Sequence, residues 1–317
     1  MSSSLPYLVE LTIRLGEGIG KLPASVREKH AEYFLGAQRP DGGFAGREGP
    51  SDLYYTAFGI RALALVAKLD GPTAELAAKF LRSQVTGHAH IIDFFSLVFA
   101  SQLIESAAGI NVFDEADNWQ SRVAQAIESL RVADGGYAKT PEGSAASTYY
   151  SFLAVLTRQL TLQPIIDPDT LGDFVLSQRR ADGGFVEIRP MRRGGTNPTA
   201  AGVGLLRVLD TMDPNNQRLT DEVRETVADF LLDLQTDEGG FKANTVIPIA
   251  DLLSTFTALL TLADLGFAHE ADLPAVRQFV ESVAQPDGGF VAANWDGVVD
   301  VEYSFYGLAT RALLETI

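Results

Sequence analysis

Acidic residues that could act in acid–base chemistry stand at the predicted starts of two apolar helices. Asp251 precedes the apolar run 252–262, and Asp300 precedes a run that contains Glu302 and Tyr303. A carboxyl group in apolar surroundings keeps its proton to a higher pH, because desolvation disfavours the anion. We therefore predict Asp251, Asp300, Glu302 and Tyr303 as candidate catalytic residues.

A cluster of arginines stands out from an acidic background. Arg189, Arg192 and Arg193 lie within five residues, and Arg179–Arg180 lies just upstream. The planar guanidinium fork suits phosphate oxygens. We predict that these three arginines bind the anionic head of a substrate. The alternative is a solvated loop whose arginines form salt bridges with nearby acids.

A repeat supplies the elements that must position these residues. Asp287–Phe290 reads Asp-Gly-Gly-Phe, and close variants occur at 41–44, 134–137, 182–185 and 238–241. The spacing corresponds to a unit of about 50 residues, with the motif absent from the second unit, and such a period is typical of repeat architectures. Adjacent glycines can supply the positive φ values that a sharp helix-to-helix reversal requires.

Each unit is predicted to contain a helix pair. Amphipathic outer helices are expected over 26–37, 73–84, 119–131, 169–178, 220–235 and 273–284, and more apolar inner helices are expected to open at Asp52, Asp93, Ser147, Asn197, Asp251 and Asp300. Helices that are apolar nearly all round are buried. The pattern predicts an all-α fold, an (α/α)6 barrel in one domain over 1–317. An amphipathic N-terminal helix that ends near Gly16–Gly18 is expected to cap it within 1–22.

The six inner-helix starts also have a purely structural interpretation. All are Asp, Asn or Ser, which are preferred N-cap residues. A hydroxyl residue follows four positions later in four of the units, as Thr56, Ser151, Thr255 and Ser304. Capping alone therefore accounts for the acids, and a role at the mouth of a central cavity is the functional alternative.

Composition narrows the classes of function. The formal net charge of −16 and a pI near 4.6 argue against a nucleic-acid partner. The chain has no cysteine, which excludes disulfides and thiolate ligands. We find no signal peptide pattern and no run of 18 apolar residues, so we expect a cytoplasmic protein without a membrane span.

The repeat units and the segment Val299–Ala309 resemble the β subunits of protein prenyltransferases, and the nearest type is the one that modifies Rab proteins. The resemblance covers Val26–Ile317. The wider superfamily includes squalene–hopene and other terpene cyclases. The resemblance implies a barrel whose apolar funnel holds an isoprenoid chain. It also implies a helical-repeat α subunit as partner, with a homodimer as the alternative.

The zinc site implied by the resemblance is incomplete. The family's zinc is held by an Asp, a Cys and a His, and these positions correspond to Asp251, Leu253 and Tyr303. One ligand does not make a zinc site, so we expect no metal and no other cofactor. Arg189–Pro190 resembles the family's Arg-Pro near the diphosphate. We expect the aromatic side chains at the inner-helix starts to line the funnel, namely Tyr54, Tyr150, Phe256 and Phe305.

Three further classes of function stay open. A terpene-cyclase alignment gives Glu302 as the proton donor, preceded by Asp300, but Tyr303 replaces the last Asp of that motif. A non-catalytic lipid-binding or protein-interaction module is the second class. A carbohydrate enzyme with paired carboxylates is the third; it would require a cleft lined by Trp and Tyr, and the chain has only two Trp.

Overall fold

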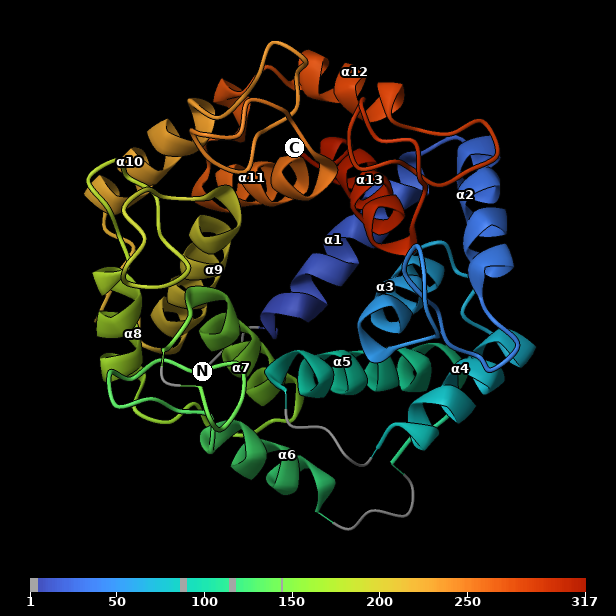
Figure 1. The fold of residues 1–317 in the computed structure, drawn as a ribbon, viewed down its shortest axis with the longest axis horizontal. Helices are drawn as coiled ribbons and strands as arrows, with labels where there is room; N and C mark the ends of the chain where they lie inside the picture. Colours follow the sequence, from blue (N-terminus) through green and yellow to red (C-terminus); the bar gives the residue numbers. More distant parts are fainter. Residues whose placement is uncertain (1–4, 86–89, 114–117, 144) are drawn as a thin grey trace.

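The computed structural model describes residues 5–85, 90–113, 118–143 and 145–317. Two concentric rings of helices surround a central axis (Figure 1). The outer ring consists of α2 (Ala24–Ala37), α4 (Gly71–Ser83), α6 (Trp119–Glu128), α8 (Pro168–Ser177), α10 (Asp221–Leu232) and α12 (Leu273–Ser282). The inner ring consists of α3 (Leu53–Leu65), α5 (Ile91–Ala108), α7 (Thr148–Leu160), α9 (Thr196–Met212), α11 (Leu252–Leu265) and α13 (Val301–Leu314). The predicted all-α (α/α)6 barrel is confirmed.

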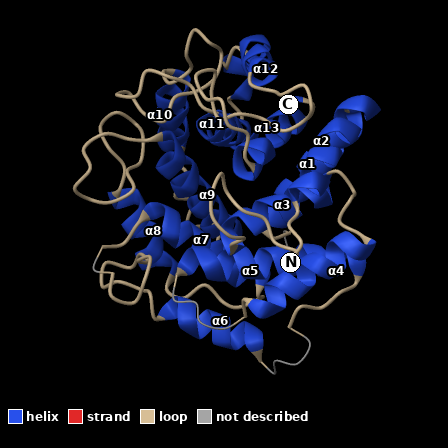
Figure 2. Cartoon of the chain, turned by 45° about the vertical axis from the view of Figure 1, so that its right-hand side comes forward, coloured by secondary structure: helices blue, strands red, loops and turns tan. Residues whose placement is uncertain are grey.

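Burial follows the two helix types. The inner helix α11 buries residues on nearly every side, whereas the outer helix α12 buries only Val276, Phe279 and Val280. Loops join the helices, and within the described ranges the only β pairing consists of isolated bridges (Figure 2). Of the described helices, α5 alone is long and apolar enough to cross a membrane on length and composition. In the barrel it packs between α3 and α7.

The Gly-Gly-aromatic turns differ in one respect from the sequence prediction. The first glycine of each pair has positive φ, for example +94° at Gly239, but among the second glycines only Gly289 does. Gly240 is required for a different reason: a Cβ there would lie 2.6 Å from the Phe279 ring. The prediction that both glycines adopt positive φ is therefore wrong for four of the five pairs.

The aromatic residue of each turn is held by a hydroxyl on the following inner helix. The backbone N–H of Phe241 donates to Thr255 Oγ1 at 2.9 Å, and the equivalent bonds at the other turns join Phe44 to Thr56, Tyr137 to Ser151, Phe185 to Thr199 and Phe290 to Ser304. This bond satisfies a buried backbone donor. It gives the repeats a common register.

That register corrects two predicted caps. In repeat four the hydroxyl is Thr199, so the cap position four residues earlier is Gly195 and not Asn197. In repeat two α5 begins at Ile91, so Asp93 lies in its first turn. The other four predicted caps are confirmed, since Asp52, Ser147, Asp251 and Asp300 each accept a backbone N–H three residues on.

An additional helix, α1 (Tyr7–Lys21), runs across the middle of the ring in the view of Figure 1. It packs on α13, α3 and α7 near the carboxyl ends of the inner helices. The prediction that this helix stops near Gly16–Gly18 is wrong. A Cβ at Gly18 would lie 2.0 Å from the backbone oxygen of Ala312, so this glycine permits close packing on α13 and does not end the helix. Residues 1–4 of the predicted capping segment lie outside the described residues.

The ring closes where the first repeat meets the last, at what we call the seam. Arg47 binds Asp296 and donates from Nε to Asp300 Oδ2 at 2.9 Å. His30 is fully buried, stacks on Phe290 at 4.7 Å and accepts the Gly289 N–H at Nδ1. Close contacts of this kind join segments that are more than 240 residues apart in sequence.

Candidate functional site

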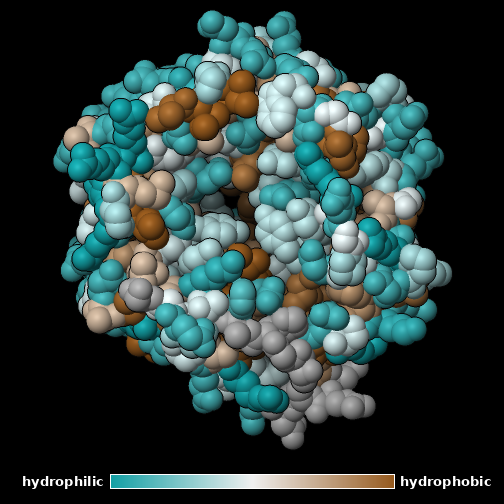
Figure 3. Space-filling model, in the orientation of Figure 1, coloured by the Kyte–Doolittle hydropathy of each residue, from teal (hydrophilic) through white to brown (hydrophobic). Residues whose placement is uncertain are grey.

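A hollow lies at the centre of the inner ring. Side chains that are partly accessible recur at three- and four-residue spacing on one face of each inner helix, although the other faces are buried; they include Tyr54, Arg61, Ile92, Phe95, Tyr149, Phe152, Asn197, Ala200, Leu253, Thr257, Glu302 and Tyr306. This spacing marks a single helical face. The space-filling view down the ring shows the surface hollowed at its centre (Figure 3). We call this group of side chains the lining of the hollow.

Glu302 is the acid that faces the hollow. The hydroxyl of Tyr54 on α3 donates to Glu302 Oε1 on α13 at 2.6 Å. Burial raises the pKa of Glu302 from 4.5 to about 7. The hydrogen bond from Tyr54 lowers this pKa, and the charge of the neighbouring Asp300 raises it. The Glu302 carboxyl group therefore titrates near neutral pH, and a general acid or base is most effective when its pKa lies near the working pH.

Tyrosines surround this carboxyl group. Burial raises the pKa of Tyr149 and of Tyr306 well above the ordinary value, and the charge of Glu302 is the next cause for both. Burial raises the pKa of Tyr303 to about 12. Their hydroxyls therefore stay protonated and can act as hydrogen-bond donors beside Glu302.

The other two predicted catalytic acids are held as helix caps. Asp300 accepts the Tyr303 N–H at Oδ1 (2.8 Å) and Arg47 at Oδ2. Asp251 accepts from the backbone N–H and the hydroxyl of Ser254, both at 2.8 Å. These bonds occupy both oxygens of each carboxylate, so the geometry accounts for both acids by capping and by seam pairing.

A cleft of about 330 Å³ lies beside these caps. Among the residues that line it are Arg47, Asp251, Trp295, Asp296 and Tyr303. Trp295 is 69% exposed, and the Arg47 guanidinium lies 6.0 Å from the ring centroid of Tyr303. The structure thus brings Asp251, Asp300 and Tyr303 into one region next to Glu302.

The predicted lining aromatics divide into two sets. Phe256 and Phe305 are buried, at 6.3 Å between ring centroids, and pack with Tyr306. Tyr54 and Tyr150 are partly exposed, and the ring centroids of Tyr150 and Tyr149 lie 5.8 Å apart. The aromatic side chains of α3, α11 and α13 therefore fill one side of the barrel, and the accessible part of the hollow adjoins them.

The arginine loop stays apart from this cluster in the described contacts. Arg189 pairs with Asp134 of the third repeat at 3.6 Å. Arg192 and Arg193 are exposed, and Arg180 holds the loop by donating to the backbone oxygens of Arg189 and Met191. The Arg189 pair is of the kind expected for the solvated-loop alternative.

Sequence reasoning missed several residues of the hollow. Arg61 is the only charged residue within α3, and a lone charge in an apolar helix is a signal that could have revealed it. Tyr306 follows Glu302 by one helical turn. Glu187 reaches the start of α7 from the loop between α8 and α9, and there its carboxylate accepts from Ser147 Oγ and its backbone oxygen accepts the Thr148 N–H. No local sequence pattern predicts that contact, because the two residues lie 40 positions apart.

The fold and site define an α/α toroid with an aromatic interior and a carboxyl group in its hollow. The family described as the prenyltransferase alpha-alpha toroid domain matches residues 3–86, 81–197 and 196–317. The chain belongs to this family, which confirms the resemblance found in the sequence. No curated protein matches the sequence.

Solved structures with different activities share the fold. Protein geranylgeranyltransferase-I of Candida albicans, complexed with GGPP, matches at a TM-score of 0.69 and 16% identity over 90% of each chain. A type II terpene cyclase from Scytonema, bound to geranylgeranyl dihydroxybenzoate, matches at 0.62 and 12% over 98% of each chain. An α-1,6-mannanase from Salegentibacter sp., as an inactive variant with mannotriose, matches at 0.62 and 13% over 92% of this chain and 98% of the enzyme.

These likenesses establish the fold and leave the chemistry to the site. The cyclase comparison covers nearly the whole of both chains, so that cyclase is a barrel of the same size. The zinc ligands implied by the sequence resemblance do not fit a metal here. Asp251 is engaged by Ser254, and Leu253 offers no donor. No cluster of three or more His, Asp or Glu suited to a metal occurs among the described residues.

Proposed function

We propose that the barrel binds an isoprenoid or similar apolar chain in its hollow. The observation that carries this proposal is the lining itself, a mainly aromatic and aliphatic surface with a few polar groups that stays partly accessible inside a ring of buried helices. Such a surface is favourable for an apolar ligand, because its burial removes more apolar area from water. The ligands of two structural neighbours, GGPP and geranylgeranyl dihydroxybenzoate, contain chains of this kind.

Glu302 is the group that could act on the bound chain. With its pKa raised to about 7, the carboxyl group can donate a proton or hydrogen bond to an oxygen carried by the chain and take it back as a base. Tyr54 donates to Oε1 and so fixes the orientation of the carboxyl group. We place the acid–base step at the carboxyl group of Glu302.

Alkene protonation, as in a terpene cyclase, is the second candidate function. The Asp300-x-Glu302 arrangement and the single-barrel cyclase neighbour favour it. A raised pKa opposes it, because alkene protonation requires a much stronger acid than a carboxyl group that titrates near 7. Oxygen chemistry therefore fits the site better.

The proposal is independent of zinc, since Leu253 and Tyr303 stand where the prenyltransferase ligands would be. The arginines Arg189, Arg192 and Arg193 are retained as the proposed contact for a diphosphate head. A cytoplasmic setting and a partner, either a helical-repeat α subunit or a second copy, belong to the same proposal. A non-catalytic lipid carrier would share the hollow and would not depend on Glu302.

The test is a titration of farnesol, farnesyl diphosphate and geranylgeranyl diphosphate by calorimetry, with parent, Glu302→Gln and the Arg192→Ala/Arg193→Ala double variant. We expect micromolar binding of all three compounds to the parent. A diphosphate contact predicts at least a tenfold loss for the diphosphates alone in the double variant, about 1.4 kcal/mol. Turnover of a bound compound that disappears in Glu302→Gln supports catalysis. Absence of binding to the parent contradicts the proposal.

A further inference from the structure

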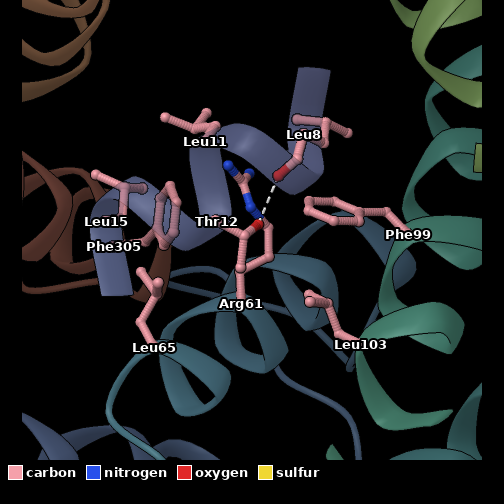
Figure 4. A pocket seen from close by; sticks show the side chains of 9 residues that line it. All are labelled: Leu8, Leu11, Thr12, Leu15, Arg61, Leu65, Phe99, Leu103 and Phe305. Atoms are coloured by element: carbon pink, nitrogen blue, oxygen red, sulfur yellow. Dashed lines mark hydrogen bonds between the residues drawn. The ribbon is translucent and has the colours of Figure 1, made fainter. Parts of the chain in front are cut away.

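Arg61 places a positive charge inside the barrel without a partner of opposite charge. Its guanidinium lies 4.0 Å from the ring centroid of Phe305, 5.2 Å from Phe58 and 5.4 Å from Phe99. The close view shows the side chain rising from α3 towards α1, between Leu11 and Phe99 (Figure 4). Across the described parts of the chain, Arg61 forms no ion pair and no hydrogen bond.

The surroundings of Arg61 are apolar on the side of α1. A cavity of about 10 Å³, room for roughly one water molecule, separates it from Leu8, Leu11 and Leu15. Thr12 also lines this cavity, and its hydroxyl donates to the backbone oxygen of Leu8 at 2.7 Å. On the side of the hollow, Tyr54, Tyr149 and Tyr306 lie close enough to influence the pKa of Arg61.

Partial burial of such a cation is costly. Arg61 keeps only part of its access to water, and contacts with aromatic faces replace only part of the hydration that the guanidinium loses. Burial also lowers the pKa of Arg61. Two cations at α1 show the contrast, because Arg14 on α1 and Arg207, which binds Glu10 of α1, both pair with Asp264. Folding alone therefore leaves the charge of Arg61 unbalanced.

The charges of the hollow are separated along its depth. Glu302 lies at the amino-terminal ends of the inner helices, where Tyr54 donates to it. Arg61 follows Tyr54 by seven residues on α3, so it lies about 10 Å further along the helix axis. A ligand with an anionic end would be attracted towards Arg61 and repelled by the acids at the opposite end.

We propose that Arg61 binds the carboxylate at one end of an apolar chain, which enters the hollow carboxylate first. This inference rests on the proposed function, because it requires the chain to occupy the hollow. A monocarboxylate fits better than a diphosphate, since one guanidinium can pair with one carboxylate in bidentate fashion and the cations at α1, Arg14 and Arg207, are already paired. Glu302 then faces a point on the chain about 10 Å from the carboxylate.

The experiment compares farnesoic acid with farnesol, which share one chain, by calorimetry at pH 7. We expect farnesoic acid to bind the parent at least tenfold more tightly than farnesol. Arg61→Met should remove that preference and leave farnesol affinity within about twofold. Arg61→Lys should retain part of the preference, because it keeps the charge and loses the fork. Arg122→Met, at an exposed position of α6, is the matched control.

Thermal melts establish that Arg61→Met is folded, and we expect it to melt at or above the parent because an unpaired charge has been removed. Equal affinity of the acid and the alcohol for the parent overturns this inference and leaves the proposed function standing. A carboxylate preference that survives Arg61→Met, or that is lost in Arg192→Ala/Arg193→Ala instead, also overturns it. If neither compound binds the parent, the proposed function fails as well.

Discussion

Charged and titratable side chains occur both in the seam and in the hollow, but the groups that bond to them differ. At the seam, Arg47 binds two carboxylates, Arg311 pairs with Glu281, and His30 accepts a backbone N–H. In the hollow, Glu302 is bonded by a neutral tyrosine and Arg61 by nothing in the described protein. Folding therefore accounts for the seam groups, whereas those of the hollow require a ligand or a reaction to explain them.

The largest expected effect comes from breaking the seam at its tightest turn. Gly289 has φ +75°, and a Cβ there would lie 2.6 Å from Val299 and 2.9 Å from the Tyr33 ring. We expect Gly289→Val to cost more than about 3 kcal/mol of unfolding free energy, measured by denaturant titration. Gly266→Val is the control, because Gly266 has φ +89° with nothing near its Cβ, and backbone strain alone costs about 1–2 kcal/mol. Equal losses in the two variants would show that the seam is not tightly packed.

The second-largest expected effect comes from a substitution in the hollow that stabilises the folded protein. The folded pKa of Glu302 lies near 7 and its ordinary value is 4.5, so unfolding releases a proton between these values and stability falls as pH rises through them. The shift corresponds to about 3 kcal/mol. We expect Glu302→Gln to be more stable than the parent by that order at pH 8 and nearly equal to it at pH 4.5. A parent and variant with parallel pH profiles would contradict the assigned burial.

A smaller effect with the opposite sign belongs to the seam. Burial, aided by the charge of Arg311, lowers the pKa of His30 from 6.5 to about 3. Unfolding then takes up a proton at pH values between these two, so His30 makes the folded protein less stable as pH falls below 6.5. At pH 5 the loss is about 2 kcal/mol. His30→Gln should flatten this part of the profile relative to the parent, and an unchanged acid limb would show that His30 is protonated in the fold.

The repeat was predictable because its determinants are local. Gly pairs, a buried aromatic and a hydroxyl on the next helix recur at fixed offsets, and capping residues such as Asp251 and Asp300 are recognisable by type. The errors arose where the local signal is missing. Repeat four has the same spacing as repeats three, five and six, but its cap position holds Gly195, which makes no side-chain cap, so the nearby Asn197 was taken as the cap in its place.

The site was predictable only in part. Glu302 and Tyr54 were both identified, but their hydrogen bond joins α3 and α13, and nothing in either segment encodes the other. The double engagement of Asp300 depends on Arg47, which lies 253 positions away. Arg61 was not among the predicted residues, although it is a single charge within an otherwise uncharged helix.

If the hollow of the barrel holds the apolar chain, a side chain that fills the hollow must weaken binding of that chain. Ala200 lies on the lining face of α9, so Ala200→Trp should place a large ring in the hollow, whereas Gln125→Trp adds the same ring on the exposed side of α6. Calorimetry with farnesol should show at least a tenfold loss of affinity, about 1.4 kcal/mol, for Ala200→Trp and none for Gln125→Trp. Farnesol binding by a folded Ala200→Trp protein with the affinity of the parent would contradict the account.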